Sequence, residues 1–223
     1  HPDDPVAQGG LKTEDYAMAD TRQPAAPIDF YFDFSSPYGY FAAEKIDALA
    51  ARYGRTVHWH PFLLGVTFKV TGLAPLPTIP LKGAYSLHDI ERSARYFDLP
   101  FRQPSAFPIP TQHAARAFLW LNDRSPVRAK AFGLAAYRAY FVDDVNISDL
   151  AAVLDLAAAQ GVNRDELAGV LTGTEIKARL AAEVDLGLSR GVFGSPFVFV
   201  DGEAFWGADR LPQVERWLAE GGF

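Results

Sequence analysis

The chain has 223 residues, 49% of them apolar and 13% aromatic, so it can bury a core of ordinary size. It contains no cysteine, which excludes disulfide bonds, thiolate metal sites and a cysteine nucleophile. The net charge of -6 offers no broad basic surface to phosphates, so we expect no nucleic-acid partner and favour a small molecule.

The first residues and the apolar runs bear on processing and location. Residues 1–17 precede Met18, the only methionine, and are interpreted as an expression-tag remnant. No apolar run approaches the roughly 18 to 20 residues of a membrane span, and the start lacks the apolar segment of a secretory signal. We therefore expect a cytoplasmic protein with no membrane partner.

The first regular elements are expected to form a β-α-β unit. Residues 28–33 alternate large apolar and polar side chains, as a half-buried strand does. Pro37 suits a first helical position, and helical spacing continues to residue 53, before Gly54. Residues 56–62 are rich in β-branched and aromatic types and predict a second strand, parallel to the first because the crossover is right-handed.

The middle of the chain is expected to be helical. Residues 65–83 are rich in proline and glycine, which indicates a long loop. Apolar residues then recur at helical spacing as far as residue 188. The predicted helices span residues 87–97, 113–121, 127–142, 150–160, 164–171 and 175–188.

The chain returns to strands at its end. Residues 196–200 and 203–206 are predicted strands, joined across the turn signal Asp201-Gly202, and a helix follows from about residue 210 to 220.

Together these elements predict the fold class, an α/β fold of the thioredoxin-like type. The β-α-β unit and the final β-β-α unit supply its sheet. The domain would be discontinuous, built from residues 27–66 and 190–223, with residues 67–189 as a large all-helical insertion.

The segment Ser36-Pro37-Tyr38-Gly39 occupies the expected functional position. In thioredoxin-like folds the active site lies where the first strand leads into the first helix, because free N–H groups and the positive end of the helix dipole are presented there. Disulfide oxidoreductases of this fold carry Cys-Pro-x-Cys at this point, whereas this chain has Ser36 and Gly39 in the two cysteine positions. Ser36 also has the simpler interpretation of a helix N-cap before Pro37, and its hydroxyl can do both.

A second signal lies in the segment 192–196, which ends in Ser195-Pro196. Pro196 opens a predicted strand, as the cis-proline of thioredoxin folds does. Because X-Pro bonds are cis in only about 5% of cases, this prediction rests on likeness to the fold and not on local sequence.

Several motifs between Asp33 and Arg210 carry a more specific resemblance. They are Asp33-Phe34-Ser35-Ser36-Pro37-Tyr38, Pro61-Phe62-Leu63-Leu64-Gly65, Phe68-Lys69, Lys82-Gly83-Ala84-Tyr85, Phe193-Gly194-Ser195-Pro196 and Trp206-Gly207-Ala208-Asp209-Arg210. In this order they resemble 2-hydroxychromene-2-carboxylate isomerases and the related kappa-class glutathione transferases.

The resemblance implies glutathione as the cofactor, with Ser36 as the catalytic serine that hydrogen-bonds the sulfur. A thiol titrating near pH 8.5 must shift by roughly two units to be mostly ionised at neutral pH, which takes about 2.7 kcal/mol. A helix N-terminus supplies up to about 2 kcal/mol, and a hydrogen bond to a charged acceptor about 1.5 to 3. One serine at one helix end is therefore sufficient.

The resemblance also implies the groups that hold the peptide part of glutathione. The backbone of Ser195 beside Pro196 would pair with the cysteinyl unit, so any side chain would serve at that position. Asp209 would accept the γ-glutamyl ammonium, the N–H of Ala208 would meet the carboxylate, and Lys82 would lie near the carboxylate side.

Two positions depart from the kappa-class pattern. Ala208 stands where these enzymes often have serine, which removes a hydroxyl and keeps the backbone donor. Leu73 stands where they have asparagine, so one expected side-chain contact is not supplied.

The leading hypothesis is a glutathione-dependent isomerase that interconverts 2-hydroxychromene-2-carboxylate, or a related aromatic carboxylate, and trans-o-hydroxybenzylidenepyruvate. The family's substrate cavity lies between the two domains, and a homodimer is a family expectation. The residues predicted to line the cavity are aromatic or cationic: Tyr38, Phe68, Lys69, Tyr85 and Trp206.

Two alternatives remain open. One is a kappa-class-like glutathione transferase or peroxidase, in which Ser36 would serve identically. The other is a redox-dead thioredoxin-like module that binds a partner through the cis-proline groove and does not bind glutathione. Metal binding is not expected, because His58 and His60 lack a third ligand nearby and are interpreted as packing or surface residues.

Overall fold

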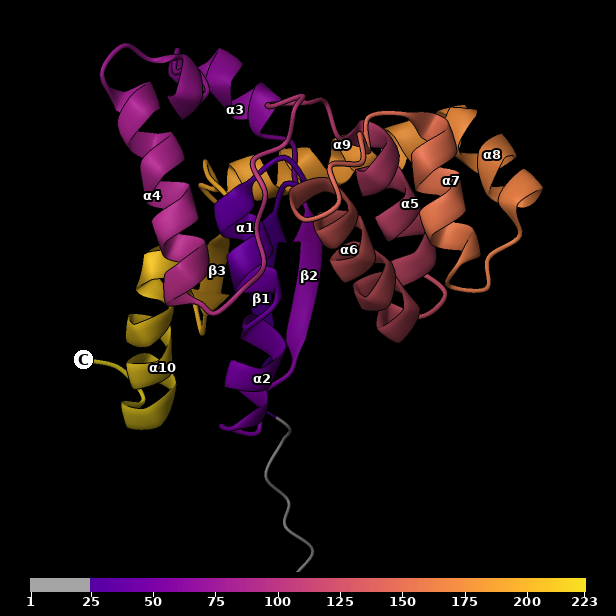
Figure 1. Ribbon diagram of the computed structural model, residues 1–223. Helices are drawn as coiled ribbons and strands as arrows, with labels where there is room; N and C mark the ends of the chain where they lie inside the picture. The colour runs from indigo at the N-terminus through magenta and orange to yellow at the C-terminus, as the bar shows by residue number, and fades with distance from the viewer. Residues whose placement is uncertain (1–24) are drawn as a thin grey trace, which may run out of the picture.

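The computed structural model describes residues 25–223 (Figure 1). The predicted tag remnant, residues 1–17, lies outside the described residues. No helix within the described part of the chain is both long and apolar enough to cross a bilayer.

A four-stranded sheet in the order β2-β1-β3-β4 forms the centre of the fold. Its strands are β1 (Ile28–Phe32), β2 (Val57–Pro61), β3 (Phe197–Val200) and β4 (Glu203–Trp206). The strands β1 and β2 are parallel, whereas β3 is antiparallel to both β1 and β4. This arrangement confirms the predicted thioredoxin-like fold.

The first predicted helix is divided in two. Helix α1 covers Pro37–Ala43 and α2 covers Ile46–Ala51. At the junction the Lys45 N–H donates to the carbonyl of Ala42, three residues back instead of four, which tightens the chain there. The apolar spacing runs unbroken through this turn, so the sequence pattern did not reveal it.

Helices fill the chain between β2 and β3. They are α3 (Leu64–Thr71), α4 (Lys82–Tyr96), α5 (Gln112–Asn122), α6 (Pro126–Phe141), α7 (Leu150–Ala158), α8 (Arg164–Thr172) and α9 (Thr174–Ser189). Helices α5 to α9 begin and end within two residues of the predicted bounds. In Figure 1, α5 to α8 lie on one side of the sheet and α4 on the other.

The predicted loop over residues 65–83 is wrong in part. It contains most of α3 and a short 3-10 helix, η1 (Leu76–Thr78), and α4 begins before the loop was expected to end. The first N–H of α3, from Leu64, donates to the carboxylate of Asp33, 31 residues earlier. A tertiary partner therefore satisfies the start of α3. The proposed domain boundary between residues 66 and 67 falls inside this helix, and the division into two domains stays a prediction.

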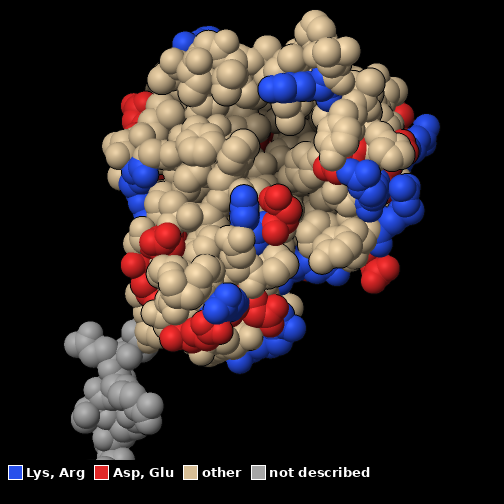
Figure 2. Space-filling model, turned by 90° about the vertical axis from the view of Figure 1, so that its left-hand side faces the viewer, with Lys and Arg blue, Asp and Glu red and all other residues tan. Residues whose placement is uncertain are grey.

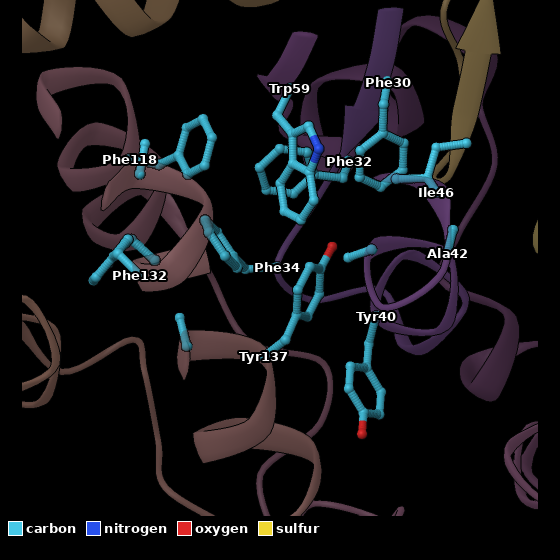
Figure 3. Packing of buried hydrophobic residues seen from close by; sticks show 14 of the residues in the cluster. Phe30, Phe32, Phe34, Tyr40, Ala42, Ile46, Trp59, Phe118, Phe132 and Tyr137 are labelled. Atoms are coloured by element: carbon cyan, nitrogen blue, oxygen red, sulfur yellow. The ribbon is translucent and has the colours of Figure 1, made fainter. Parts of the chain in front are cut away.

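An aromatic core joins the sheet to the inserted helices (Figure 3). Phe32 of β1 lies edge-on to Phe118 of α5, with ring centroids 5.2 Å apart. Phe34, just beyond β1, packs against Tyr137 of α6 at 5.1 Å. Such pairs contribute about 0.5 to 1.5 kcal/mol each beyond the area they bury. The end of β1 is thus held between the sheet and the insertion.

The chain closes with η2 (Ala208–Arg210) and α10 (Leu211–Glu220). Helix α10 packs against α2 and β3, and η2 lies beside α1. The last motif of the sequence is thereby brought to the start of the first helix.

Candidate active site

Ser36 is the N-cap of α1. Its Oγ accepts the N–H of Gly39 at 3.0 Å, and Pro37 takes the first helical position. The capping interpretation is therefore confirmed. Because the cap uses only a lone pair of Oγ, the hydroxyl proton is free to be donated elsewhere.

The cis-proline loop lies directly against Ser36. The Ser195-Pro196 bond is cis, as predicted, and the Ser36 hydroxyl donates to the carbonyl of Ser195 at 2.9 Å. The two motifs, 159 residues apart in sequence, therefore meet at one buried point. The Ser195 backbone therefore lies beside Ser36.

The side chain of Ser195 is not interchangeable, which corrects the prediction that any side chain would serve. Its Oγ accepts the backbone N–H of Asp33 at 2.9 Å in a buried position. A residue without a hydroxyl would leave that N–H without its acceptor.

Asp33 is buried beneath the site and was missed as a functional candidate, although it opens the first family motif. One carboxylate oxygen accepts the N–H of Ser35 at 2.9 Å and the hydroxyl of Thr111 at 2.6 Å, and the other accepts the N–H of Leu64 at 2.8 Å. Burial raises the pKa of this carboxyl, against the lowering effect of the hydrogen bonds.

Tyr137 completes this buried group of polar residues, and nothing in the sequence marked it. Its hydroxyl donates to the carbonyl of Asp33 at 2.8 Å, and burial raises its pKa far above the ordinary value, so the phenol is neutral.

The space at Gly39 is closed by the same network. A Cβ placed there would lie 2.6 Å from the hydroxyl of Tyr137 and 2.7 Å from Oγ of Ser195. The position of the second cysteine in disulfide oxidoreductases of this fold has no room for any side chain in this protein.

The predicted peptide-binding residues of the last motif lie next to the cis-proline loop. The N–H of Gly207 donates to the carbonyl of Pro196 at 3.0 Å. Ala208 is buried, whereas Asp209 is exposed and its carboxylate folds back over Gly207, whose φ is 109°. Ala208 and Asp209 are therefore brought to the side of the Ser195 backbone.

Lys82 is the first residue of α4 and is exposed. Its N–H donates to the carbonyl of Pro80 at 2.8 Å across Leu81, whose φ is 68°. Gly83, the next residue, lies against the carbonyl of Pro77, where a Cβ would not fit. This tight turn fixes where α4 begins, and no hydrogen bond joins Lys82 to Ser36.

Two of the residues predicted to contact substrate meet through α4. The hydroxyl of Tyr38 donates to Asp89 at 2.5 Å, and Asp89 also pairs with Arg92. Arg92 in turn donates to the hydroxyl of Tyr85 at 3.1 Å. Nothing in the sequence marked Asp89 and Arg92, because their role depends on the contact between α4 and α1.

Trp206 lies beside the cis-proline loop, apart from the pair of tyrosines. It is 56% exposed, and its indole covers Gly194 and packs against Phe193 with ring centroids 4.9 Å apart. Phe68 and Lys69 lie on α3, and no hydrogen bond or ring contact of the described residues joins them to the others. Phe193 was missed as a candidate.

Figure 2 shows the face that carries α3, α4 and α10 in Figure 1. A hollow opens near its centre, lined mainly by uncharged groups, with acidic and basic side chains at the edge. Two further surface cavities, of about 210 and 400 Å³, do not include Ser36, and of the predicted site residues only Trp206 lines one of them, the smaller.

His60 lies away from this site and differs from its predicted packing or surface role. Its two ring nitrogens lie 2.6 Å from Glu183 and 2.8 Å from Asp29. Burial lowers the pKa of His60, but the hydrogen bonds to the two carboxylates raise it further, so the net shift is upward. His60 is an ion-paired residue between β1, β2 and α9, whereas His58 is exposed.

Known proteins resemble this chain over most of its length. The DSBA-like thioredoxin domain family matches residues 27–219. The chain is 30% identical to 2-hydroxychromene-2-carboxylate isomerase of Sphingobium xenophagum, over 86% of this chain and 98% of that protein. It is also 30% identical to glutathione S-transferase kappa 2 of Caenorhabditis elegans, over 86% and 92%.

A solved structure of a 2-hydroxychromene-2-carboxylate isomerase shares the fold, with a TM-score of 0.79, 23% identity and coverage of 87% of this chain and 95% of that one. The fold and site thus define a thioredoxin-like protein without the dithiol. The chain belongs to the DSBA-like thioredoxin family, in the branch of the 2-hydroxychromene-2-carboxylate isomerases and kappa-class glutathione transferases.

Proposed function

We propose that this protein is a glutathione-dependent isomerase that interconverts 2-hydroxychromene-2-carboxylate, or a closely related aromatic carboxylate, and trans-o-hydroxybenzylidenepyruvate. The observation that carries the proposal is the Ser36 hydroxyl. It is buried at the start of α1, has a proton to donate and faces the cis-proline loop, in a chain without cysteine. When bound, glutathione would supply a thiolate that adds reversibly to a conjugated carbon, so that rotation about a single bond becomes possible.

The residues around Ser36 fit a thiol-bearing peptide. Ser36 keeps its cap by accepting from Gly39 while its proton turns from the Ser195 carbonyl to the ligand sulfur. That carbonyl is then available to accept the N–H of the ligand's cysteinyl unit, and the Ser195 N–H donates in return. A hydrogen bond to a charged acceptor contributes about 1.5 to 3 kcal/mol, which is the amount that a shift of roughly two pKa units needs.

The outer parts of glutathione would be held by charged groups at the edge of the site. Asp209, which follows the loop tied to Pro196, would accept the γ-glutamyl ammonium. The N–H of Ala208 and the side chain of Lys82 would bind the carboxylates.

The aromatic substrate would lie among aromatic side chains on either side of Ser36. Tyr38 and Tyr85 are linked through Asp89 and Arg92 of α4, and Trp206 lies beside the cis-proline loop. Phe68 and Lys69 of α3 remain part of the proposed lining.

The transferase alternative is supported by one observation. The sequence identity to the kappa-class protein, 30%, equals the identity to the isomerase. Glutathione-dependent isomerisation of the chromene should therefore be assayed beside conjugation of chlorodinitrobenzene. Strong conjugation with no isomerisation would contradict the isomerase proposal.

Calorimetry with glutathione on the wild type and on Ser36→Ala tests the site. We expect both proteins to bind, because the peptide contacts are unchanged, and only the wild type to show the thiolate absorbance at ~240 nm. No binding to either protein would favour the partner-binding module instead. Equal thiolate absorbance would mean that Ser36 is only a cap.

A cytoplasmic location and a homodimer also remain proposals drawn from the family. Light scattering coupled to size exclusion measures the second: a mass near that of the single 24.5 kDa chain would contradict it.

A further inference from the structure

Within residues 25–223, Asp33 is the one buried carboxylate at the site, and the mechanism above does not use it. It lies three residues before Ser36, whose N–H donates to the Asp33 carbonyl at 3.0 Å. None of the salt bridges formed in this part of the chain includes Asp33. A buried carboxylate without a cation is costly unless other groups stabilise it.

Hydrogen-bond donors and two helix starts stabilise this carboxylate. Leu64 is the first residue of α3 and Thr111 is the N-cap of α5, and both donate to it. The third donor is the N–H of Ser35. The backbone N–H groups of Ser35 and Leu64 donate to different oxygens of the Asp33 carboxylate, Oδ1 and Oδ2. A backbone N–H cannot accept a proton, so both oxygens must act as acceptors. This is the arrangement of an ionised carboxylate.

The other titratable groups that face Asp33 come from α6. They are Tyr137 and Tyr140, and burial raises the pKa of both, so both are neutral. Ser195 meets only the backbone of Asp33 and carries no charge. Burial raises the pKa of Asp33, but the donors to both of its oxygens favour the ionised form. In that form its carboxylate is a negative charge beside the position where a thiolate would form.

We infer that Asp33 is a positioning residue that raises the pKa of a thiol held at Ser36. Ser36 and the helix start favour the thiolate, and the Asp33 charge opposes it. This balance suits reversible addition, because a thiol with a strongly lowered pKa is a weak nucleophile and one with a high pKa is a slow leaving group. The inference rests on the proposed thiol chemistry at this site.

The expected size of the effect follows from Coulomb's law. As an order of magnitude, two like charges at an assumed separation of about 8 Å and an effective dielectric constant of about 20 to 40 shift each other's pKa by roughly one unit. Removal of the Asp33 charge should therefore lower the pKa of the thiol by about one unit.

The test uses a thiol built into the protein, so it does not depend on glutathione binding. Since the chain has no cysteine, Ser36→Cys provides a single thiol whose pKa is read from absorbance at ~240 nm and from the pH dependence of alkylation. We expect a pKa about one unit lower in Ser36→Cys/Asp33→Asn. An unchanged or higher pKa overturns the inference. Failure of the wild type to bind glutathione would instead overturn the proposed function and leave this result standing.

Ser36→Cys/Thr111→Val is the matched control, because it removes one hydrogen bond to the carboxylate and keeps the charge. The thiol pKa of this control should not fall. If loosening of the site lowered the thiol pKa, the pKa would fall in the Thr111→Val variant as well as in the Asp33→Asn variant. A fall equal to that in the Asp33→Asn variant contradicts an electrostatic role.

Asp33→Asn brings an amide NH2 against a backbone N–H in either orientation, which can prevent this variant from folding. The single variant Ser36→Cys then answers the same question. It is alkylated either with iodoacetate, which leaves a negative group, or with iodoacetamide, which leaves a neutral one. Because the two charges act on each other equally, a negative group at position 36 should raise the pKa of Asp33. Carboxyl carbon NMR should show this pKa to be higher in the iodoacetate product than in the iodoacetamide product by up to about one unit. Equal values overturn the inference.

Discussion

Gly39→Ala should destabilise the protein, although the same change in an open helix stabilises it. Gly39 is the third residue of α1, where glycine is less favourable than alanine by about 1 kcal/mol. The added Cβ would lie 2.6 Å from the Tyr137 hydroxyl and 2.7 Å from Oγ of Ser195. Both oxygens are held in place by buried hydrogen bonds to the backbone of Asp33.

The magnitude follows from these opposing effects. Overpacking at a buried site costs about 1 to 3 kcal/mol, and the gain in helix propensity offsets up to about 1 kcal/mol. We therefore expect the free energy of unfolding to fall by roughly 1 to 2 kcal/mol. Urea unfolding at neutral pH, followed by circular dichroism, measures it from the midpoint and the slope.

Gly169→Ala is the matched control. Gly169 lies inside α8 and is exposed, and no atom stands within 4 Å of the place that a Cβ would take, so alanine should stabilise by about 0.5 to 1 kcal/mol. Tyr137→Phe removes one of the two oxygens that crowd Gly39. In the double variant the Gly39→Ala penalty should be smaller than in the wild type. If Gly39→Ala stabilises as much as Gly169→Ala, then Tyr137 and Ser195 do not close the space beside Gly39.

Two further predictions concern ion pairs and hydrogen bonds outside the sulfur site. The pKa of His60 is raised, and the pKa values of Asp29 and Glu183 are lowered. The stabilisation by protonated His60 is therefore complete below a pH of about 6.5 and is lost as the pH rises through the pKa of His60 in the folded protein. The free energy of unfolding should therefore decline with pH, by at most about 1.4 kcal/mol per pH unit for one proton, and His60→Gln should flatten this decline. An unchanged pH profile in urea unfolding would exclude the ion-pair role. Tyr38→Phe should cost about 1 to 2 kcal/mol by removing the bond to Asp89. A double-mutant cycle with Asp89→Asn should give a coupling above about 0.5 kcal/mol, and additivity would show that the bond contributes nothing.

The amino-acid sequence by itself determined the sheet, most helices and the start of the site. Alternation in residues 28–33 and helical spacing in the insertion are local patterns, because burial on one face imposes a period of two or about 3.6. Ser36 before Pro37 was recognisable as a cap for the same reason, since capping involves residues three apart. The prediction that the bond before Pro196 is cis came from likeness to the fold and not from the neighbouring residues.

Only the tertiary structure decided what surrounds Ser36. Asp33 forms hydrogen bonds with three residues that are distant in sequence. They are Thr111, Tyr137 and Ser195, which lie 78, 104 and 162 residues away. Such partners leave no period or spacing in the sequence, because a hydrogen bond needs proximity in space and not along the chain.

The same reason explains two of the differences between the predictions and the structure. Asp33 accepts the N–H of Leu64 at the start of α3, and the pKa of His60 is raised because Asp29 and Glu183 reach it from β1 and α9. Likeness to the fold and to the family motifs located the serine that would meet a thiol. The folded chain decided which buried carboxylate stands beside it.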